Sequence, residues 1–139
     1  DESLVRFGCA VVIDCHSMLS AGALPFRENE RPLDIVLGDR FGASCSGAIT
    51  AAAEETLVRL GYNVSRNAPY AGGHVAAAYG RPMEGVHVLQ IEINRALYLD
   101  ERRIARTEGF DRLKDNLREL IAALSRFSPA ALRPARAAE

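Results

Sequence analysis

Two short stretches combine apolar residues with side chains that can do chemistry. The first is the apolar run 9–13, which continues directly into an acid, a thiol, an imidazole and a hydroxyl: Asp14, Cys15, His16 and Ser17. The second is 86–95, an apolar strand pattern with Glu92 near its end and an Asn-Arg pair after it. In open α/β sheets ligands bind beyond the carboxyl ends of strands, so we expect these two strand ends to meet at one site.

His16 is the candidate metal ligand. Imidazole is a common zinc ligand, and Asp14 or a backbone carbonyl could fix its tautomer as an outer partner. The alternative is a hydrogen-bonded histidine at a strand end, since no HExxH or CxxC pattern supplies further ligands. Of the other histidines, His87 lies early in its strand and is interpreted as structural, whereas His74 follows a double glycine.

Glu92 is the candidate general base. An ionised carboxylate inside an apolar strand is costly to bury, and the raised pKa that results suits a base. The alternative places Glu92 on a solvent-facing side of the strand with Gln90 and Asn94, because the three alternate along it. Cys15 and His16 are neighbours along a strand and point to opposite faces, so we predict a core position for Cys15 rather than a Cys-His dyad.

Several polar residues at strand ends and in Gly- and Pro-containing loops could bind a substrate. The planar guanidinium of arginine matches a carboxylate, so these positions suggest a small anionic molecule. Taken singly, each residue fits an ordinary surface residue in a salt bridge better than a substrate-binding one. The candidates are Asp39, Arg40, Arg66, Asn67, Tyr70, Arg81 and Arg95.

The composition limits the class of protein. A chain of 139 residues with 48% hydrophobic content is typical of one soluble domain. A net charge of -1 gives no electrostatic footprint for nucleic acid or an anionic membrane, and no apolar run approaches the roughly 20 residues that cross a bilayer. Three cysteines without paired spacing favour a reducing compartment, so we expect a cytoplasmic protein.

The elements that must position these residues alternate between strand and helix. The predicted strands cover 9–13, 34–38, 62–65 and 86–93, and the predicted helices cover 47–60, 74–79 and 110–124. Residues 17–33 lack periodicity and are predicted to form a loop. The opening residues before Gly8 are typical of the last turn of a helix, as if the chain started within an αβ unit. We therefore predict one α/β domain over 1–139, with a mixed, largely parallel sheet flanked by helices.

Five motifs, in this order, resemble the N-formylglutamate amidohydrolase family over positions 9 to 101. They are IDCHSM at 13–18, DIVLGDRFG at 34–42, NAPYAGG at 67–73, YGRP at 79–82 and QIEINRALY at 90–98. The resemblance implies a fold related to the zinc carboxypeptidases and aminoacylases, of the phosphorylase/hydrolase-like type. It also implies metal-dependent cleavage of N-formyl-L-glutamate to formate and glutamate, in histidine degradation.

The resemblance implies a role for each site residue. His16 is implied to bind zinc, and Glu92 to activate the metal-bound water and pass its proton to the leaving amine. The residues implied to line the pocket for the glutamate carboxylates are Arg40, Asn67, Tyr70 and Arg95. Family members extend further at the N-terminus, so the other zinc ligands are expected upstream of Asp1. The chain is then the C-terminal part of an amidohydrolase-like domain, in which His74 occupies a position expected to hold a bulkier apolar or aromatic residue.

Two other functions fit the same residues. One is a related zinc hydrolase that acts on another N-acyl amino acid or a peptide, because the pocket loops decide the substrate. The other is a non-catalytic remnant or binding module that keeps the arginine pocket without the full metal site. The sequence does not indicate an oligomeric state.

Overall fold

A four-stranded mixed sheet forms the centre of the molecule. The computed structural model describes residues 2–23 and 31–132. The strands are β1 (Ala10–Met18), β2 (Ile35–Gly38), β3 (Val64–Arg66) and β4 (Val86–Asn94), in the order β1-β4-β2-β3. β1 pairs with β4 and β2 with β3 in parallel, whereas β2 and β4 are antiparallel. The predicted mixed, largely parallel sheet is thus confirmed.

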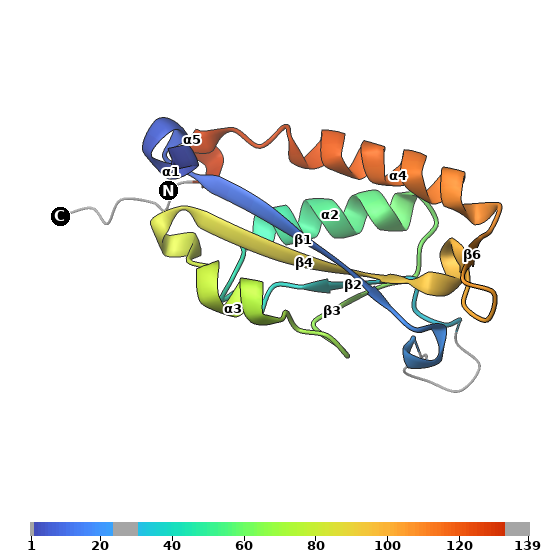
Figure 1. The fold of residues 1–139 in the computed structure, drawn as a ribbon. Helices are drawn as coiled ribbons and strands as arrows, with labels where there is room; N and C mark the ends of the chain where they lie inside the picture. Colours follow the sequence, from blue (N-terminus) through green and yellow to red (C-terminus); the bar gives the residue numbers. More distant parts are fainter. Residues whose placement is uncertain (1, 24–30, 133–139) are drawn as a thin grey trace.

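Helices cover both faces of this sheet. The α-helices are α1 (Glu2–Phe7), α2 (Gly47–Arg59), α3 (His74–Tyr79), α4 (Gly109–Leu124) and α5 (Pro129–Leu132). The 3-10 turns are η1 (Ser20–Gly22), η2 (Pro82–Glu84) and η3 (Arg95–Leu97), and a small hairpin pairs β5 (Leu99–Asp100) with β6 (Ala105–Arg106). Figure 1 shows α2 and α4 on one side of the sheet and α3 on the other. Among the described helices, none has both the length and the apolar character of a membrane span.

Two hydrophobic cores lie on opposite faces of the sheet. The larger one packs α2 and α4 against the odd positions of β4: Leu89, Ile91 and Ile93. The smaller one contains Met18 and Val36, with Tyr70 packed against it. Because side chains alternate along a strand, the even positions of β4 face away from the larger core. This alternation places Gln90, Glu92 and Asn94 on the face that carries α3.

Local signals fix the ends of α2, close to their predicted positions. Ser46 caps its N-terminus, where the side-chain oxygen accepts a hydrogen bond from the backbone N–H of Ala48. After the helix, Gly61 adopts a φ of +91°, which favours glycine. Within α2, Leu57 is fully buried whereas its neighbour Val58 is 55% exposed.

We expect Leu57→Ala to lower the free energy of unfolding by about 2–5 kcal/mol, because it leaves a cavity between α2 and the sheet. Val58→Ala is the matched control and is expected to change it by no more than about 0.5 kcal/mol. Urea unfolding of both variants measures the difference. Equal losses would contradict the face of α2 described here.

The surroundings of His87 agree with its interpretation as a structural residue. Its ring is buried, and Nδ1 accepts a hydrogen bond from the backbone N–H of Ser46 at 3.2 Å. Since Nδ1 is the acceptor, the proton of the neutral ring lies on Nε2, which donates to the carbonyl oxygen of Leu132 at 3.1 Å. His87 therefore ties α5 to the start of α2.

The strand β1 differs from its prediction. It continues to Met18 rather than ending at Ile13, because it pairs with β4 along its whole length and this satisfies its backbone groups. Cys15 is exposed, and its predicted core position is wrong, because β1 lies at an edge of the sheet. Residues 24–30 of the predicted loop lie outside the described residues.

Candidate active site

The parallel pairing of β1 and β4 brings the two predicted site residues together. In their register His16 lies opposite Glu92, and Asp14 lies opposite Gln90. Paired residues of neighbouring strands point to the same face, so the four polar side chains form one cluster. Glu92 and Gln90 are only 7% and 3% exposed, whereas the side chain of His16 is 45% exposed. The cluster lies within the two strands, rather than beyond their carboxyl ends as predicted.

The imidazole of His16 lies between two carboxylates. Its Nε2 is 3.1 Å from Asp14 Oδ2, and its Nδ1 is 3.7 Å from Glu92 Oε1. Oδ2 of Asp14 is buried and accepts no hydrogen bond from the described residues. Asp14 thus lies beside the ring whose tautomer it was predicted to fix.

Glu92 is buried, together with the other polar residues on its side of β4. Gln90 and Asn94 are 3% and 4% exposed, so the alternative of a solvent-facing side is wrong. The backbone N–H of Gly73 and the carbonyl of Leu33 bind these two amides and cover the face. Burial is the largest effect on the Glu92 carboxyl and raises its pKa above the ordinary 4.5; His16 opposes the rise, Asp14 adds to it and Arg95 opposes it.

This raised pKa predicts a pH dependence of stability. The folded state holds the Glu92 proton to higher pH than the unfolded state does, so the free energy of unfolding falls as pH rises above 4.5, until the folded-state pKa is passed. We expect Glu92→Gln, which stays neutral, to lose this decline and to be more stable than the natural chain at neutral pH. Urea unfolding between about pH 4 and 8 measures both proteins. If the free energy of unfolding depended on pH in the same way in both proteins, the effect of burial on the Glu92 carboxyl would be contradicted.

Two of the predicted substrate-binding arginines follow strands of the central sheet, Arg95 after β4 and Arg40 after β2. Arg95 follows β4 directly, and its Nε donates a hydrogen bond to Ser17 Oγ at the end of β1, at 3.1 Å. Arg40 has a φ of +52°, and its backbone N–H donates to the carbonyl of Ala71. The side chain of Arg40 passes Gly72, where an added Cβ would lie 3.0 Å from Arg40 Cγ.

Asn67 and Tyr70 shape the same loops. The Asn67 side chain donates to Asp39 Oδ1 at 2.8 Å, and its oxygen accepts from the backbone N–H groups of Asp39 and Phe41. Its amide therefore holds the turn that carries Arg40. Tyr70 packs on the smaller core, and its hydroxyl lies near Gly22, where an added Cβ would be 3.2 Å away.

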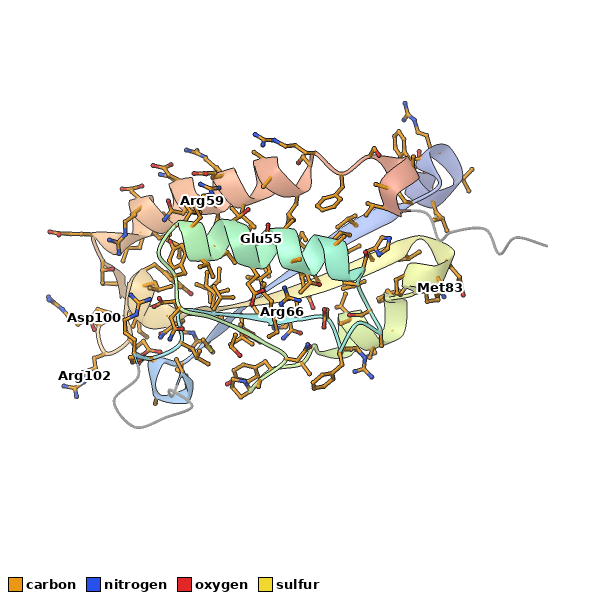
Figure 2. The ribbon with its side chains drawn as sticks, turned by 180° about the vertical axis from the view of Figure 1, so that it is seen from behind. Glu55, Arg59, Arg66, Met83, Asp100 and Arg102 are labelled. Carbon is orange, nitrogen blue, oxygen red and sulfur yellow. The ribbon has the colours of Figure 1, made fainter. Side chains whose placement is uncertain are left out.

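Other candidates lie apart from the cluster. Arg66, labelled in Figure 2, forms an ion pair with Glu54 of α2. Arg81 forms one with Glu84 just before the N-terminal end of β4, whereas Glu92 lies near its C-terminal end. His74 is exposed at the start of α3. Asp39 is buried, and its carboxylate accepts from Thr50 Oγ1 and the backbone of Gly42. Asp39 therefore closes a turn.

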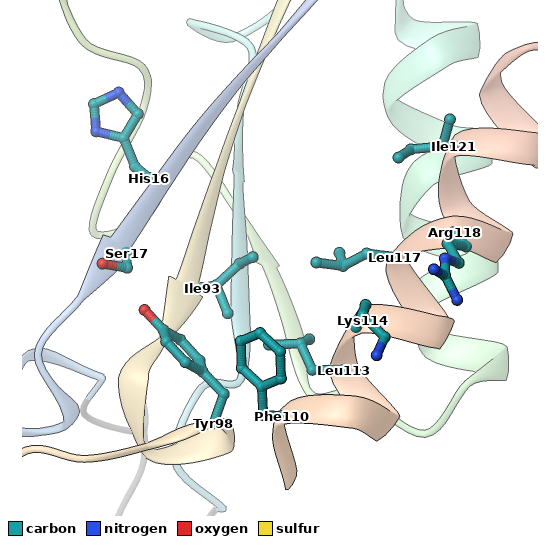
Figure 3. Close-up of a pocket in the computed structure, with 10 residues that line it drawn as sticks. All are labelled: His16, Ser17, Ile93, Tyr98, Phe110, Leu113, Lys114, Leu117, Arg118 and Ile121. Carbon is teal, nitrogen blue, oxygen red and sulfur yellow. The ribbon is translucent and has the colours of Figure 1, made fainter. Parts of the chain in front are cut away.

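An apolar hollow of about 410 Å³ lies on the helical side of β1. It is lined mainly by side chains of α4, such as Leu117 and Ile121, together with Ile93. His16 and Ser17 of β1 also line it, although Figure 3 shows the His16 ring on the other side of the β1 ribbon from the α4 side chains. Asp14, Gln90 and Glu92 do not line the hollow, so it meets the polar cluster only at His16. Catalysis needs titratable groups close together, and they lie on the opposite face.

The described residues do not complete a zinc site. In 2–23 and 31–132, no group of three or more His, Cys, Asp or Glu side chains is arranged to hold a metal ion. Zinc in a catalytic site has about three protein ligands. His16, with the unpartnered oxygen of Asp14 beside its ring, fits a single ligand and its outer partner.

Comparison with known proteins adds to this geometry. The family model of the N-formylglutamate amidohydrolases matches residues 1–99. The chain belongs to this family. Proteins named N-formylglutamate deformylase from Pseudomonas aeruginosa and Pseudomonas putida are 36% and 29% identical to it, each over 73% of the chain. These matches confirm the resemblance predicted from the five motifs.

The solved structures agree. The crystal structure of an N-formylglutamate amidohydrolase from Ralstonia eutropha JMP134 is 38% identical, with a TM-score of 0.77 over 89% of the chain. A gene product of Agrobacterium tumefaciens, 21% identical with a TM-score of 0.55, shares the fold. The chain covers 39% and 38% of the two Pseudomonas relatives and 45% of the Ralstonia structure. It therefore spans less than half the length of these N-formylglutamate amidohydrolase family members.

Gln90 is the residue of this cluster that was not predicted to have a functional role. The sequence contained its signal, because it precedes Glu92 by two residues and so shares its face of β4. What the sequence did not contain is its partner, the backbone of a loop whose position depends on tertiary packing.

Proposed function

We propose that this chain supplies the general base, one metal ligand and the substrate-binding arginines of an enzyme that hydrolyses N-formyl-L-glutamate to formate and glutamate. The observation that carries the proposal is the distance of 3.7 Å between His16 Nδ1 and the buried Glu92 carboxylate, in a chain of this family. A buried carboxylate beside a candidate metal ligand is the arrangement that water activation requires.

In the proposed reaction Glu92 moves one proton. Zinc bound by His16 and by ligands outside the described residues would polarise the formyl oxygen and lower the pKa of a water toward about 7. The ionised Glu92 accepts the proton of this water, whose oxygen bonds to the formyl carbon. Glu92 then gives the proton to the amide nitrogen as the C–N bond breaks, which releases formate and the free amine. Asp14 holds the imidazole of His16 in one orientation.

The substrate-binding part of the proposal rests on charge. Arg95 is close enough to Glu92 to influence its pKa, and Arg40 lies beside the loop at Gly72; their guanidinium groups match the two carboxylates of a glutamate derivative. Tyr70 is proposed to line the same pocket, and Asn67 to contribute through the turn that it holds. The free cysteines Cys9, Cys15 and Cys45 support a cytoplasmic protein. We also propose that residues 1–139 belong to one α/β domain.

The test is the hydrolysis of three substrates by the longest natural form of the protein: N-formyl-, N-acetyl- and N-succinyl-L-glutamate. We expect the formyl compound to have the highest kcat/KM. A preference for another acyl group would instead favour the related hydrolase, whose pocket loops select a different substrate. Glutamate binding in calorimetry, without turnover of any of the three, would favour the binding module.

A further inference from the structure

The buried amide of Gln90 lies between the backbone of a loop and the carboxylate of Glu92. Its Oε1 accepts a hydrogen bond from the backbone N–H of Gly73, and its Nε2 donates to Glu92 Oε1 at 3.1 Å. Gln90 is 3% exposed, so solvent does not compete strongly for either contact. The two hydrogen bonds join the loop before α3 to the candidate base.

The contact with Gly73 fixes which end of the amide faces Glu92. A backbone N–H can only donate, so the atom of Gln90 that meets it must be the oxygen. The NH₂ group then points to Glu92 and can only donate. A carboxylate oxygen accepts such a bond, and the charge on it strengthens the bond.

The loop reaches Gln90 because small residues let its backbone approach the sheet. At Gly38, the last residue of β2, an added Cβ would lie 2.7 Å from Gly72 N and 2.8 Å from the carbonyl carbon of Ala71. At Gly73 an added Cβ would lie 3.0 Å from Gln90 Oε1. Side chains at either position would displace the donor, so the motif that carries Gly72 and Gly73 also determines the orientation of the amide.

We propose that Gln90 is a positioning residue, which holds the carboxylate of Glu92 in one orientation beside His16. This inference rests on the proposed function, in which Glu92 is the base. Of the two carboxylate oxygens of Glu92, Gln90 donates to Oε1. In the strand register Gln90 lies opposite Asp14, and not opposite His16. We therefore assign it an effect on Glu92 and not a contact with the substrate.

Kinetics of the full natural chain test this role. Gln90→Met keeps the side-chain length without a donor, and we expect kcat to fall about 10- to 100-fold, part of what a general base contributes, with KM changed by less than about threefold. Gln90→Glu keeps an acceptor for Gly73 but has no amide donor, and it should lower kcat at least as much. In a chain that already carries Glu92→Gln, adding Gln90→Met should lower kcat by less than about a further twofold, because both substitutions act on the same carboxylate.

A second measurement does not depend on activity. In NMR spectra of the natural chain, the side-chain NH₂ of Gln90, assigned from its loss in Gln90→Met, should show a downfield proton that exchanges slowly with solvent. Glu92→Leu should abolish this shift, whereas Glu55→Gln, at an exposed position on α2, should leave it unchanged.

The two readouts separate the possible failures. A chain that shows the coupled NMR signal but hydrolyses no N-formyl-L-glutamate would refute the proposed function, while the contact between Gln90 and Glu92 would stand. An unshifted amide, a Gln90→Glu variant with natural kcat, or equal losses from Gln90→Met in both backgrounds would overturn the positioning role.

Discussion

Glu92→Gln is expected to lower kcat/KM for N-formyl-L-glutamate by about 100- to 10,000-fold, the range that a general base contributes. Glutamine keeps the size of the side chain and can still meet Gln90, but it cannot accept the proton of water. The loss should appear in kcat more than in KM, because the missing interaction belongs to the transition state. Initial rates of formate release from the longest natural chain measure it.

The matched control is Glu55→Gln, the same chemical change at an exposed position of α2. We expect its kcat/KM to stay within about twofold of the natural value, since surface substitutions away from the site have small effects. Activity retained in Glu92→Gln would remove Glu92 as the base. Unfolding curves of both variants show whether a loss of activity reflects chemistry or loss of the fold.

His16→Ala should produce the second large effect, which is loss of bound zinc together with loss of turnover. Removing an outer-shell partner of a metal ligand typically costs about 10- to 100-fold in metal affinity, and removing the ligand itself should cost more. Metal analysis of the purified natural chain and the variant, after dialysis against a weak chelator, measures the stoichiometry. The rate of formate release is measured on the same samples.

Asp14→Asn provides a graded comparison. Its amide keeps the shape but loses the charge that faces His16 Nε2 at 3.1 Å, so we expect about 10- to 100-fold weaker zinc affinity. The expected order of affinity is natural chain, Asp14→Asn, His16→Ala. Undiminished zinc in His16→Ala would show that this imidazole is not a ligand, and the metal-dependent part of the proposed function would fail.

The elements with the clearest periodicity were predictable from the sequence. The pattern of leucines over 110–124 predicted α4 (Gly109–Leu124), and the apolar run from Val86 predicted β4. β1 was predicted too short, because the polar residues after Ile13 do not favour a strand by themselves. Pairing with β4 supplies the hydrogen bonds that extend it, and such pairing is not visible in local composition.

The candidate site was predictable in its parts. Sequence alone selected His16 and Glu92 by residue type and by their position near the ends of apolar runs. It left open whether Glu92 faces solvent, because alternation along a strand assigns residues to faces without saying which face is covered. The covering groups come from distant segments, including the backbone N–H of Gly73.

The sequence by itself determined the family, the alternation of strands and helices, and which residue types were available for chemistry. Only the tertiary structure decided that β1 and β4 run parallel with His16 opposite Glu92, and that Gln90 links Glu92 to the loop at Gly73. The physical reason is that strand register and burial depend on contacts between segments distant in the chain, whereas periodicity and residue type are local. The cluster of His16, Asp14, Gln90 and Glu92 exists because that register places four side chains on one face.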